Sequence, residues 1–182
     1  ASVTSGFFGK YIGDRNSEIV TSLFVSISAL LSLIIFYQVI VNNYENNVVI
    51  ATWINSGTLE VDWSIKIDSL SSVMLVVVTL VSSLVHIYSI GYMSHDPHKP
   101  RFMAYLSLFT FAMLTLVTSD NFLQLFFGWE GVGLCSYFLI GFWFKKDSAN
   151  AAAIKAFVVN RVGDFGFALG IFLIFYLFGT VN

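Results

Sequence analysis

The sequence predicts an all-α membrane protein, a bundle of five to six transmembrane helices with a surface β-hairpin around residues 48–67. Three observations predict this fold class. Of 182 residues, 57% are hydrophobic and 11% charged, whereas roughly a quarter of an ordinary soluble chain is charged. Several apolar runs reach the ~20 residues that a helix needs to cross a bilayer. One polar segment alternates as a strand does.

Four of the apolar runs are long enough to span a membrane: Ile19–Val41, Leu70–Tyr92, Phe102–Thr118 and Phe122–Phe144. A fifth run, from about residue 151 to residue 178, contains Arg161 and Asp164 and can span with a polar interruption. Residues 1–12 read as the tail of a helix whose start is missing. This gives five helices and a partial sixth.

Polar linkers separate these runs: Lys10–Glu18, Asn42–Asp68, Ser94–Arg101, Ser119–Asn121 and Lys145–Asn150. The longest linker contains the predicted hairpin. Apolar and polar residues alternate strictly from Leu59 to Asp68, which predicts a strand with Leu59, Val61, Trp63, Ile65 and Ile67 on its buried face. Val48–Trp53 is the predicted partner strand, and Asn55-Ser56-Gly57 supplies the turn.

Basic residues predict the orientation of the bundle. If the loops alternate sides, one side collects Lys10, Arg15, Lys99, Arg101, Lys145 and Lys146, with Lys155 near the helix end, and the other side has Lys66 among acidic residues. Because basic loops stay on the cytoplasmic side, the basic side should face the cytoplasm or the mitochondrial matrix.

Glu130 is the strongest candidate site residue because it lies in the middle of an apolar run, where Trp129 should pack beside it. A charged side chain there costs roughly 2.5–3.5 kcal/mol on insertion scales, so its default interpretation is functional. No Lys, Arg or Asp lies within four residues, so a charge partner must come from another helix. Burial favours the neutral carboxyl, and we expect Glu130 to exchange a proton near neutral pH. The alternative is a structural, hydrogen-bonded glutamate.

Arg161 and Asp164 form a second candidate site. Their i, i+3 spacing puts both on one helix face, where they can pair and offset each other's desolvation. The pair either fixes helix packing or opens to free a carboxylate for proton transfer. His86, on the Leu70–Tyr92 run, titrates near neutrality and could pass protons, although a histidine in such a position is more often a satisfied core residue.

Composition also limits the cofactors and partners. The net charge of −2 without clustered basic residues argues against nucleic acid. The single cysteine, Cys135, excludes an internal disulfide, and the sequence has no phosphate-binding glycine loop, cysteine cluster or nucleotide fingerprint. His95 and His98 share a proline-containing loop without further ligands, which favours a surface turn over a metal site. We therefore expect no cofactor or metal in this chain.

Specific motifs stand in four places: Tyr92-Met93-Ser94-His95-Asp96-Pro97, Asn121-Phe122-Leu123-Gln124, Gly128-Trp129-Glu130-Gly131-Val132-Gly133 and Asn160-Arg161-Val162-Gly163-Asp164. With them the sequence resembles chain 5 of NADH:ubiquinone oxidoreductase, the distal antiporter-like membrane subunit of respiratory complex I, in its mitochondrial form. The multi-subunit sodium/proton antiporters are more distant relatives.

The resemblance implies a proton pathway through the position of Glu130, with the positions of Arg161 and Asp164 taking part in proton transfer. It implies that residues 1–182 are one membrane domain, the N-terminal part of a larger subunit whose partner lysine lies beyond this segment. It further implies a mitochondrial inner membrane, or a bacterial plasma membrane, and contact with other membrane-arm subunits and lipid, cardiolipin included. FMN, iron–sulfur clusters and ubiquinone are then expected in partner subunits. The alternatives are a non-conducting assembly segment and a sodium/proton antiporter subunit.

Overall fold

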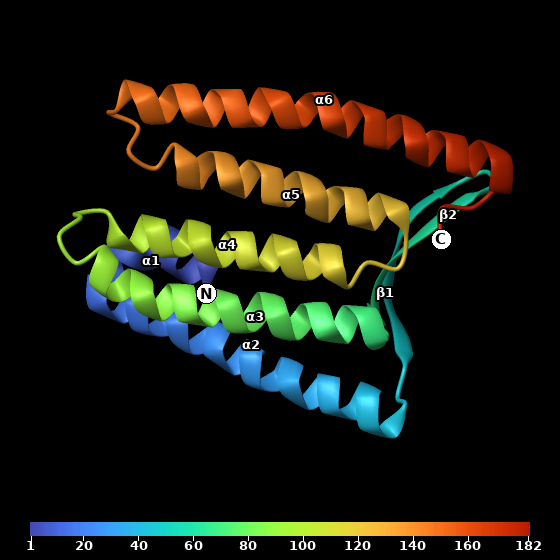
Figure 1. Cartoon of the computed structure of the whole chain (residues 1–182), viewed down its shortest axis with the longest axis horizontal. Coiled ribbons are helices and arrows are strands. Elements are labelled where there is room, and N and C mark those ends of the chain that lie inside the picture. Colours follow the sequence, from blue (N-terminus) through green and yellow to red (C-terminus); the bar gives the residue numbers. More distant parts are fainter.

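The computed structural model describes the backbone of residues 1–182 and all side chains except that of Lys10. The described residues form six helices and one hairpin (Figure 1): α1 (Ser2–Ile12), α2 (Asp14–Asn42), β1 (Asn46–Ser56), β2 (Leu59–Ile67), α3 (Ser69–Tyr92), α4 (Lys99–Val117), α5 (Phe122–Ile140) and α6 (Asp147–Phe178). The five helices from α2 to α6 are long and apolar enough to cross a membrane, whereas α1 has 11 residues. The predicted bundle is confirmed.

Several predicted boundaries are wrong. Helix α4 begins at Lys99 rather than Phe102 and α6 at Asp147 rather than near residue 151, and two other boundaries differ more. The expected linker Lys10–Glu18 is almost entirely helical, because α1 runs to Ile12 and α2 begins at Asp14. The break between them is a single residue, Gly13, whose φ of 86° suits a residue without a Cβ.

The predicted span to Phe144 also ends early, since α5 stops at Ile140 and α6 starts at Asp147. Arg101 accounts for the early end. Its Nη2 donates to the carbonyl oxygen of Phe142 at 3.1 Å, and its guanidinium lies 4.7 Å from the centre of the Phe142 ring. The segment after α5 therefore turns toward the start of α4 rather than continuing the helix.

The spanning helices alternate in direction, so α2, α4 and α6 begin where α3 and α5 end (Figure 1). This end of the bundle, called the basic end below, carries Arg15, Lys99, Arg101, Lys145 and Lys146. The opposite end carries the hairpin, which crosses the ends of the helices, and is called the hairpin end (Figure 1). Lys66 lies there on β2.

The hairpin is confirmed, but β1 is longer than the predicted Val48–Trp53, β2 ends at Ile67 rather than Asp68, and the turn is different. Ser56 pairs with Leu59, so the connection is Gly57-Thr58 rather than residues 55–57. Gly57 has a φ of 62°, which matches the first central position of a two-residue hairpin turn.

The predicted buried face of β2 is only partly correct. Val61 is buried and Ile65 is exposed, while Ser64, on the predicted polar face, is buried. Ser64 is buried because the start of α5 lies against it, with the Gln124 side chain bonded to its backbone.

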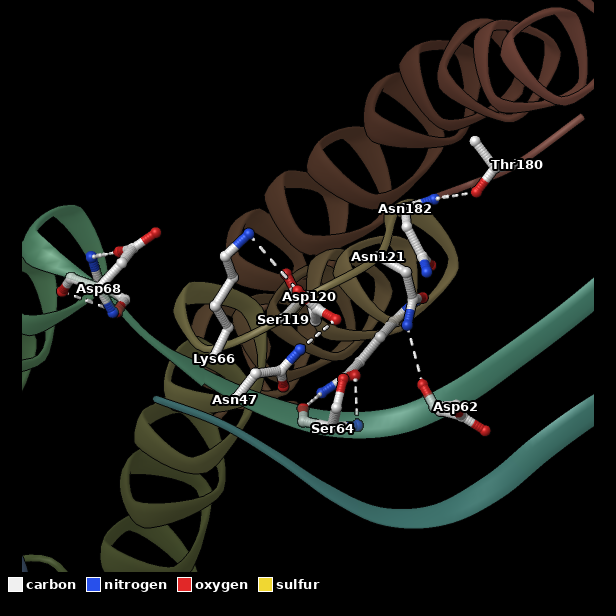
Figure 2. A network of polar contacts seen from close by, with 12 residues as sticks. Asn47, Asp62, Ser64, Lys66, Asp68, Ser119, Asp120, Asn121, Thr180 and Asn182 are labelled. Atoms are coloured by element: carbon white, nitrogen blue, oxygen red, sulfur yellow. Dashed lines mark hydrogen bonds and ion pairs between the residues drawn. The ribbon is translucent and has the colours of Figure 1, made fainter. Parts of the chain in front are cut away.

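Polar contacts hold the hairpin against the start of α5 (Figure 2). Asn121 caps α5 by accepting the N–H of Gln124 at 2.8 Å, and its Nδ2 donates to the carbonyl oxygen of Asp62 at 2.8 Å. The Gln124 side chain bonds both backbone groups of Ser64, accepting at 3.1 Å and donating at 2.7 Å. These contacts hold the N-terminal end of α5, the helix that carries Glu130, against the hairpin.

Glycines let α4 and α5 approach closely. A Cβ added to Gly128 would lie 2.7 Å from the backbone N and Cα of Leu116, and one added to Gly131 would lie 3.1 Å from the Cβ of Ala112. Small residues of this kind are typical of tight helix contacts in membranes. One face of α5 is thus committed to α4.

Candidate functional site

Glu130 is the ninth of 19 residues in α5. At 1.5 Å per residue it lies about 12 Å from the start of the helix, close to the middle of a hydrocarbon core about 30 Å thick. Its Oε2 contacts Nη1 of Arg161 on α6. The expectation that its charge partner comes from another helix is therefore confirmed.

Arg161 also contacts Asp164, one turn further along α6, through Nη1 and Oδ2 at 3.4 Å. The predicted pairing of Arg161 with Asp164 is present, but it is not an isolated pair, since the same guanidinium is shared with Glu130. The exposed fractions of the side chains are 43% for Arg161, 24% for Glu130 and 10% for Asp164. Asp164 is the most deeply buried of the three.

Trp129 is a member of the site that sequence reasoning did not assign. Its indole Nε1 donates to Oδ1 of Asp164 at 2.8 Å, and its ring packs edge-on against Phe167 with centroids 6.1 Å apart. The prediction that it packs beside Glu130 missed this bond. An indole N–H in an apolar segment needs an acceptor, and that need is the signal that could have found it.

The four side chains form a cluster with two potential negative charges and one fixed positive charge: Trp129, Glu130, Arg161 and Asp164. Because a guanidinium does not lose its proton in proteins, the cluster becomes neutral by adding one proton to a carboxylate. Asp164 accepts hydrogen bonds at both of its carboxylate oxygens, from Trp129 and from Arg161. Glu130 contacts only the shared Arg161 among the described side chains.

A cavity of about 220 Å³ adjoins the cluster between α5 and α6. Its lining residues are Trp129, Glu130, Val132, Gly133, Ser136, Phe157, Asn160, Arg161 and Asp164. The cavity is large enough for several water molecules, and its polar groups could hold them. The two carboxylates and the guanidinium that were predicted as site residues all line it.

His86 lies elsewhere, between α3 and α4, with an exposed fraction of 0%. Its Nδ1 is 2.7 Å from the carbonyl oxygen of Ser82, and its Nε2 is 3.1 Å from Oγ of Ser107. Both ring nitrogens thus have partners. The structure brings Glu130, Arg161 and Asp164 together and leaves His86 in a different helix interface.

Two family descriptions match parts of the chain. The family described as NADH-Ubiquinone oxidoreductase (complex I), chain 5 N-terminus matches residues 53–103. The family described as NADH:quinone oxidoreductase/Mrp antiporter, TM matches residues 119–182, the segment that contains the cluster.

Curated relatives match the whole chain. It is 59% identical over 181 residues to NADH-ubiquinone oxidoreductase chain 5 of Triticum aestivum and 54% identical over 182 residues to NADH-quinone oxidoreductase subunit L of Rickettsia bellii. Each alignment covers 100% of this chain but only 27% and 28% of the respective relative. The chain thus spans about a quarter of the length of these relatives.

Solved structures share the fold. The membrane-bound sulfane sulfur reductase, an archaeal respiratory membrane complex, matches with a TM-score of 0.83 and 20% identity, over 100% of this chain and 37% of that one. The Mrp complex from Dietzia sp. DQ12-45-1b matches with a TM-score of 0.80 and 21% identity, over 99% and 19%. At these identities the likeness concerns the fold alone.

The fold is thus shared with subunits of these membrane complexes, and the segment that holds the cluster matches the family of NADH:quinone oxidoreductase and Mrp antiporter membrane domains. The sequence identity along the whole chain indicates which subunit of this kind the chain is similar to. Along its whole length the chain is similar to part of NADH-ubiquinone oxidoreductase chain 5, and residues 53–103 match the family of that subunit's N-terminus.

Proposed function

We propose that this chain is part of a membrane-arm subunit of a proton-pumping NADH:ubiquinone oxidoreductase, and that its cluster carries protons during turnover. The observation that carries the proposal is the contact of Glu130, deep in α5, with an Arg161 that also holds Asp164. A buried cluster that is one proton short of neutrality is suited to gaining and losing that proton.

In the proposed step, Glu130 accepts a proton from water in the adjoining cavity. The neutral carboxyl of Glu130 attracts the guanidinium less strongly, so Arg161 then pairs with Asp164 alone. Release of the proton restores the shared arrangement. The switch uses a pair of carboxylates that compete for one cation, and Trp129 keeps Asp164 in place throughout.

Partners and location follow from the family. Other membrane-arm subunits, the remainder of the same subunit and bilayer lipid, cardiolipin included, are the proposed neighbours, and nucleic acid is not. FMN, iron–sulfur clusters and ubiquinone belong to partner subunits in this proposal. The proposed location is the mitochondrial inner membrane, with a bacterial plasma membrane as the alternative, and with the basic end facing the matrix or cytoplasm.

A sodium/proton antiporter is the second candidate, because the Mrp complex shares the fold at a TM-score of 0.80. A non-conducting assembly role is the third, and an ion pair that only fixes helix packing would suit it. Each of the three predicts a different outcome for the same purified complex.

The test is to purify the full-length subunit with its partners in mild detergent and reconstitute it into liposomes. The proposal predicts that flavin- and iron–sulfur-containing proteins co-purify, and that NADH oxidation by quinone moves protons without added sodium. The Glu130→Gln variant should then lose proton movement, and Glu45→Gln, an exposed acid at the hairpin end, should retain it. Sodium-dependent transport without NADH would favour the antiporter, and pumping by Glu130→Gln at the rate of the unsubstituted complex would favour the assembly role.

A further inference from the structure

A second set of ionisable groups lies away from the cluster, between α2, α3 and α4. We call it the polar seam and define it by six residues: Glu18, Ser22, His86, Ser89, Lys99 and Ser107. Helix α4 separates this interface from α5 and α6 (Figure 1). Small hydroxyl side chains at helix contacts are explained by close packing. A buried glutamate and a buried histidine are not explained in that way.

Glu18 marks the outer end of the polar seam. It is 6% exposed, and Nζ of Lys99 is 3.8 Å from its Oε1. That same Oε1 is buried without a hydrogen bond among the described residues, as are Oγ of Ser22 and Oγ of Ser17 on the same face of α2. Buried polar atoms that lack a protein partner are normally satisfied by bound water. Three such atoms within six residues indicate a hydrated pocket at the basic end.

His86 marks the inner end, and its contacts permit a change of protonation. The carbonyl oxygen of Ser82 can only accept, so Nδ1 carries a hydrogen. Nε2 then faces Oγ of Ser107, a hydroxyl that can donate to neutral histidine or accept from the cation. His86 can therefore take up a proton at Nε2 without losing either contact, since only the hydroxyl hydrogen has to turn.

The helix register connects the two ends. Helices α2 and α3 run antiparallel, and the 2.7 Å hydrogen bond between Ser32 and Thr79 fixes their alignment. Counting ten residues along each helix from this pair puts Ser22 level with Ser89, and four further residues bring Glu18 to the end of α3.

The resulting gap is short. Glu18 lies about seven residues beyond the level of His86, which is roughly 10 Å at 1.5 Å per residue. The hydroxyls of Ser22 and Ser89 occupy the level in between. A few water molecules, together with these hydroxyls, are enough to span such a distance with hydrogen bonds.

We propose that the polar seam is a hydrated proton-uptake path from the basic end to His86. A proton from bulk water binds the carboxylate of Glu18, and protons then shift along water and hydroxyl groups, each oxygen accepting one and releasing another. The last proton binds Nε2, and His86 becomes an imidazolium while Glu18 returns to its anionic form. Only O–H and N–H bonds form and break. The path rests on the proposed function in that it supplies protons to a proton-translocating subunit, but it uses none of the residues of the cluster.

Hydrogen–deuterium exchange at the histidine ring carbon, read by mass spectrometry, tests whether water reaches His86 in the assembled complex. Ser22→Leu should fill the seam and slow exchange of His86 at least about fivefold relative to Leu30→Phe, which adds bulk to the exposed face of α2. His95, in the loop between α3 and α4, serves as the internal reference and should not change.

If Ser22→Leu prevents assembly, Ser89→Val narrows the same level from α3 and should slow exchange in the same way. Equal exchange of His86 in the Ser22→Leu and Leu30→Phe complexes would overturn the proposal, and so would failure of His86 to exchange at all while His95 does. This readout does not depend on pumping. The exchange experiment can therefore contradict the proton-uptake path while Glu130→Gln still loses pumping, and the opposite combination of results is equally possible.

Discussion

The indole Nε1 of Trp129 donates a 2.8 Å hydrogen bond to Oδ1 of Asp164, joining α5 to α6 beside the guanidinium of Arg161. With Arg161 at its other oxygen, Asp164 is held from two helices. These two contacts hold the Asp164 carboxylate, whose exposed fraction is 10%, in a fixed position. The neighbouring Glu130 is held by its single contact with Arg161.

Trp129→Phe should lower the proton-pumping rate of the assembled complex about tenfold. The phenyl ring keeps the packing against Phe167, but Asp164 loses a hydrogen bond to a charged group, worth about 1.5 kcal/mol, or a factor of ten. Trp143→Phe is the matched control, because Trp143 donates a 3.1 Å bond to Asp96 in an exposed loop. Pumping should be measured by dye quenching in proteoliposomes, and equal effects of the two substitutions would contradict the prediction.

Arg161→Gln should destabilise the subunit by about 3 kcal/mol, because it leaves two carboxylates without their cation in a low-dielectric setting. Glu130→Gln combined with Arg161→Gln should be less destabilised than Arg161→Gln alone, since one of the unpaired carboxylates is gone. Assembly on native gels and thermal stability in detergent measure both. Strictly additive effects of the two substitutions would mean that Glu130 and Arg161 are not coupled.

Gln124→Leu should loosen the hairpin from α5. The Gln124 amide, 1% exposed, satisfies both the N–H and the carbonyl of Ser64, and leaving buried backbone groups unpaired costs about 1–3 kcal/mol. Limited proteolysis near Gly57 from the hairpin side should become several-fold faster. Asn47→Ala removes an exposed contact to Asp120 and should change the cleavage rate little.

Asp68 should make the start of α3 sensitive to acid. Its Oδ1 accepts the N–H of Ser71 at 2.7 Å, and this backbone bond, above all, holds the pKa of Asp68 below its ordinary value. A carboxyl with a lowered folded-state pKa contributes stability above its unfolded pKa of about 3.9, and the contribution is lost as pH falls through the folded value.

Asp68→Ala should therefore cost about 1 kcal/mol at neutral pH, and the difference from the unsubstituted protein should shrink in acid. Unfolding in detergent followed by circular dichroism across this pH range measures the difference. A penalty that is independent of pH would show that the charge of Asp68 does not contribute.

Long, strongly apolar elements were predictable from sequence because membrane length and hydrophobicity leave few alternatives. The spans that become α2 to α5, and the hairpin, required no tertiary information. Local details depended on contacts between distant residues. The early end of α5 follows from Arg101 reaching Phe142, and the burial of Ser64 follows from its contact with Gln124.

The site was predictable to the same extent. Glu130, Arg161 and Asp164 stood out because ionisable groups are rare in apolar runs, and the need for an interhelical partner for Glu130 followed from its sequence neighbours. The identity of the cation that pairs with Glu130 could not be predicted from sequence spacing, because it depends on how α5 packs on α6. Glu18 was placed in a linker and so was overlooked. The stripe of Ser17, Thr21 and Ser22 at helical spacing was the signal that α2 begins before it.

The most direct test of the central claim asks whether Glu130 changes its protonation state during turnover. Infrared difference spectra of the reconstituted complex, recorded with and without NADH, report the carbonyl stretch of protonated carboxyl groups. We predict a turnover-dependent carboxyl band that is absent in Glu130→Gln, together with loss of proton pumping in that variant. Difference spectra of Glu130→Gln that superimpose on those of the unsubstituted complex, with full pumping, would contradict the account.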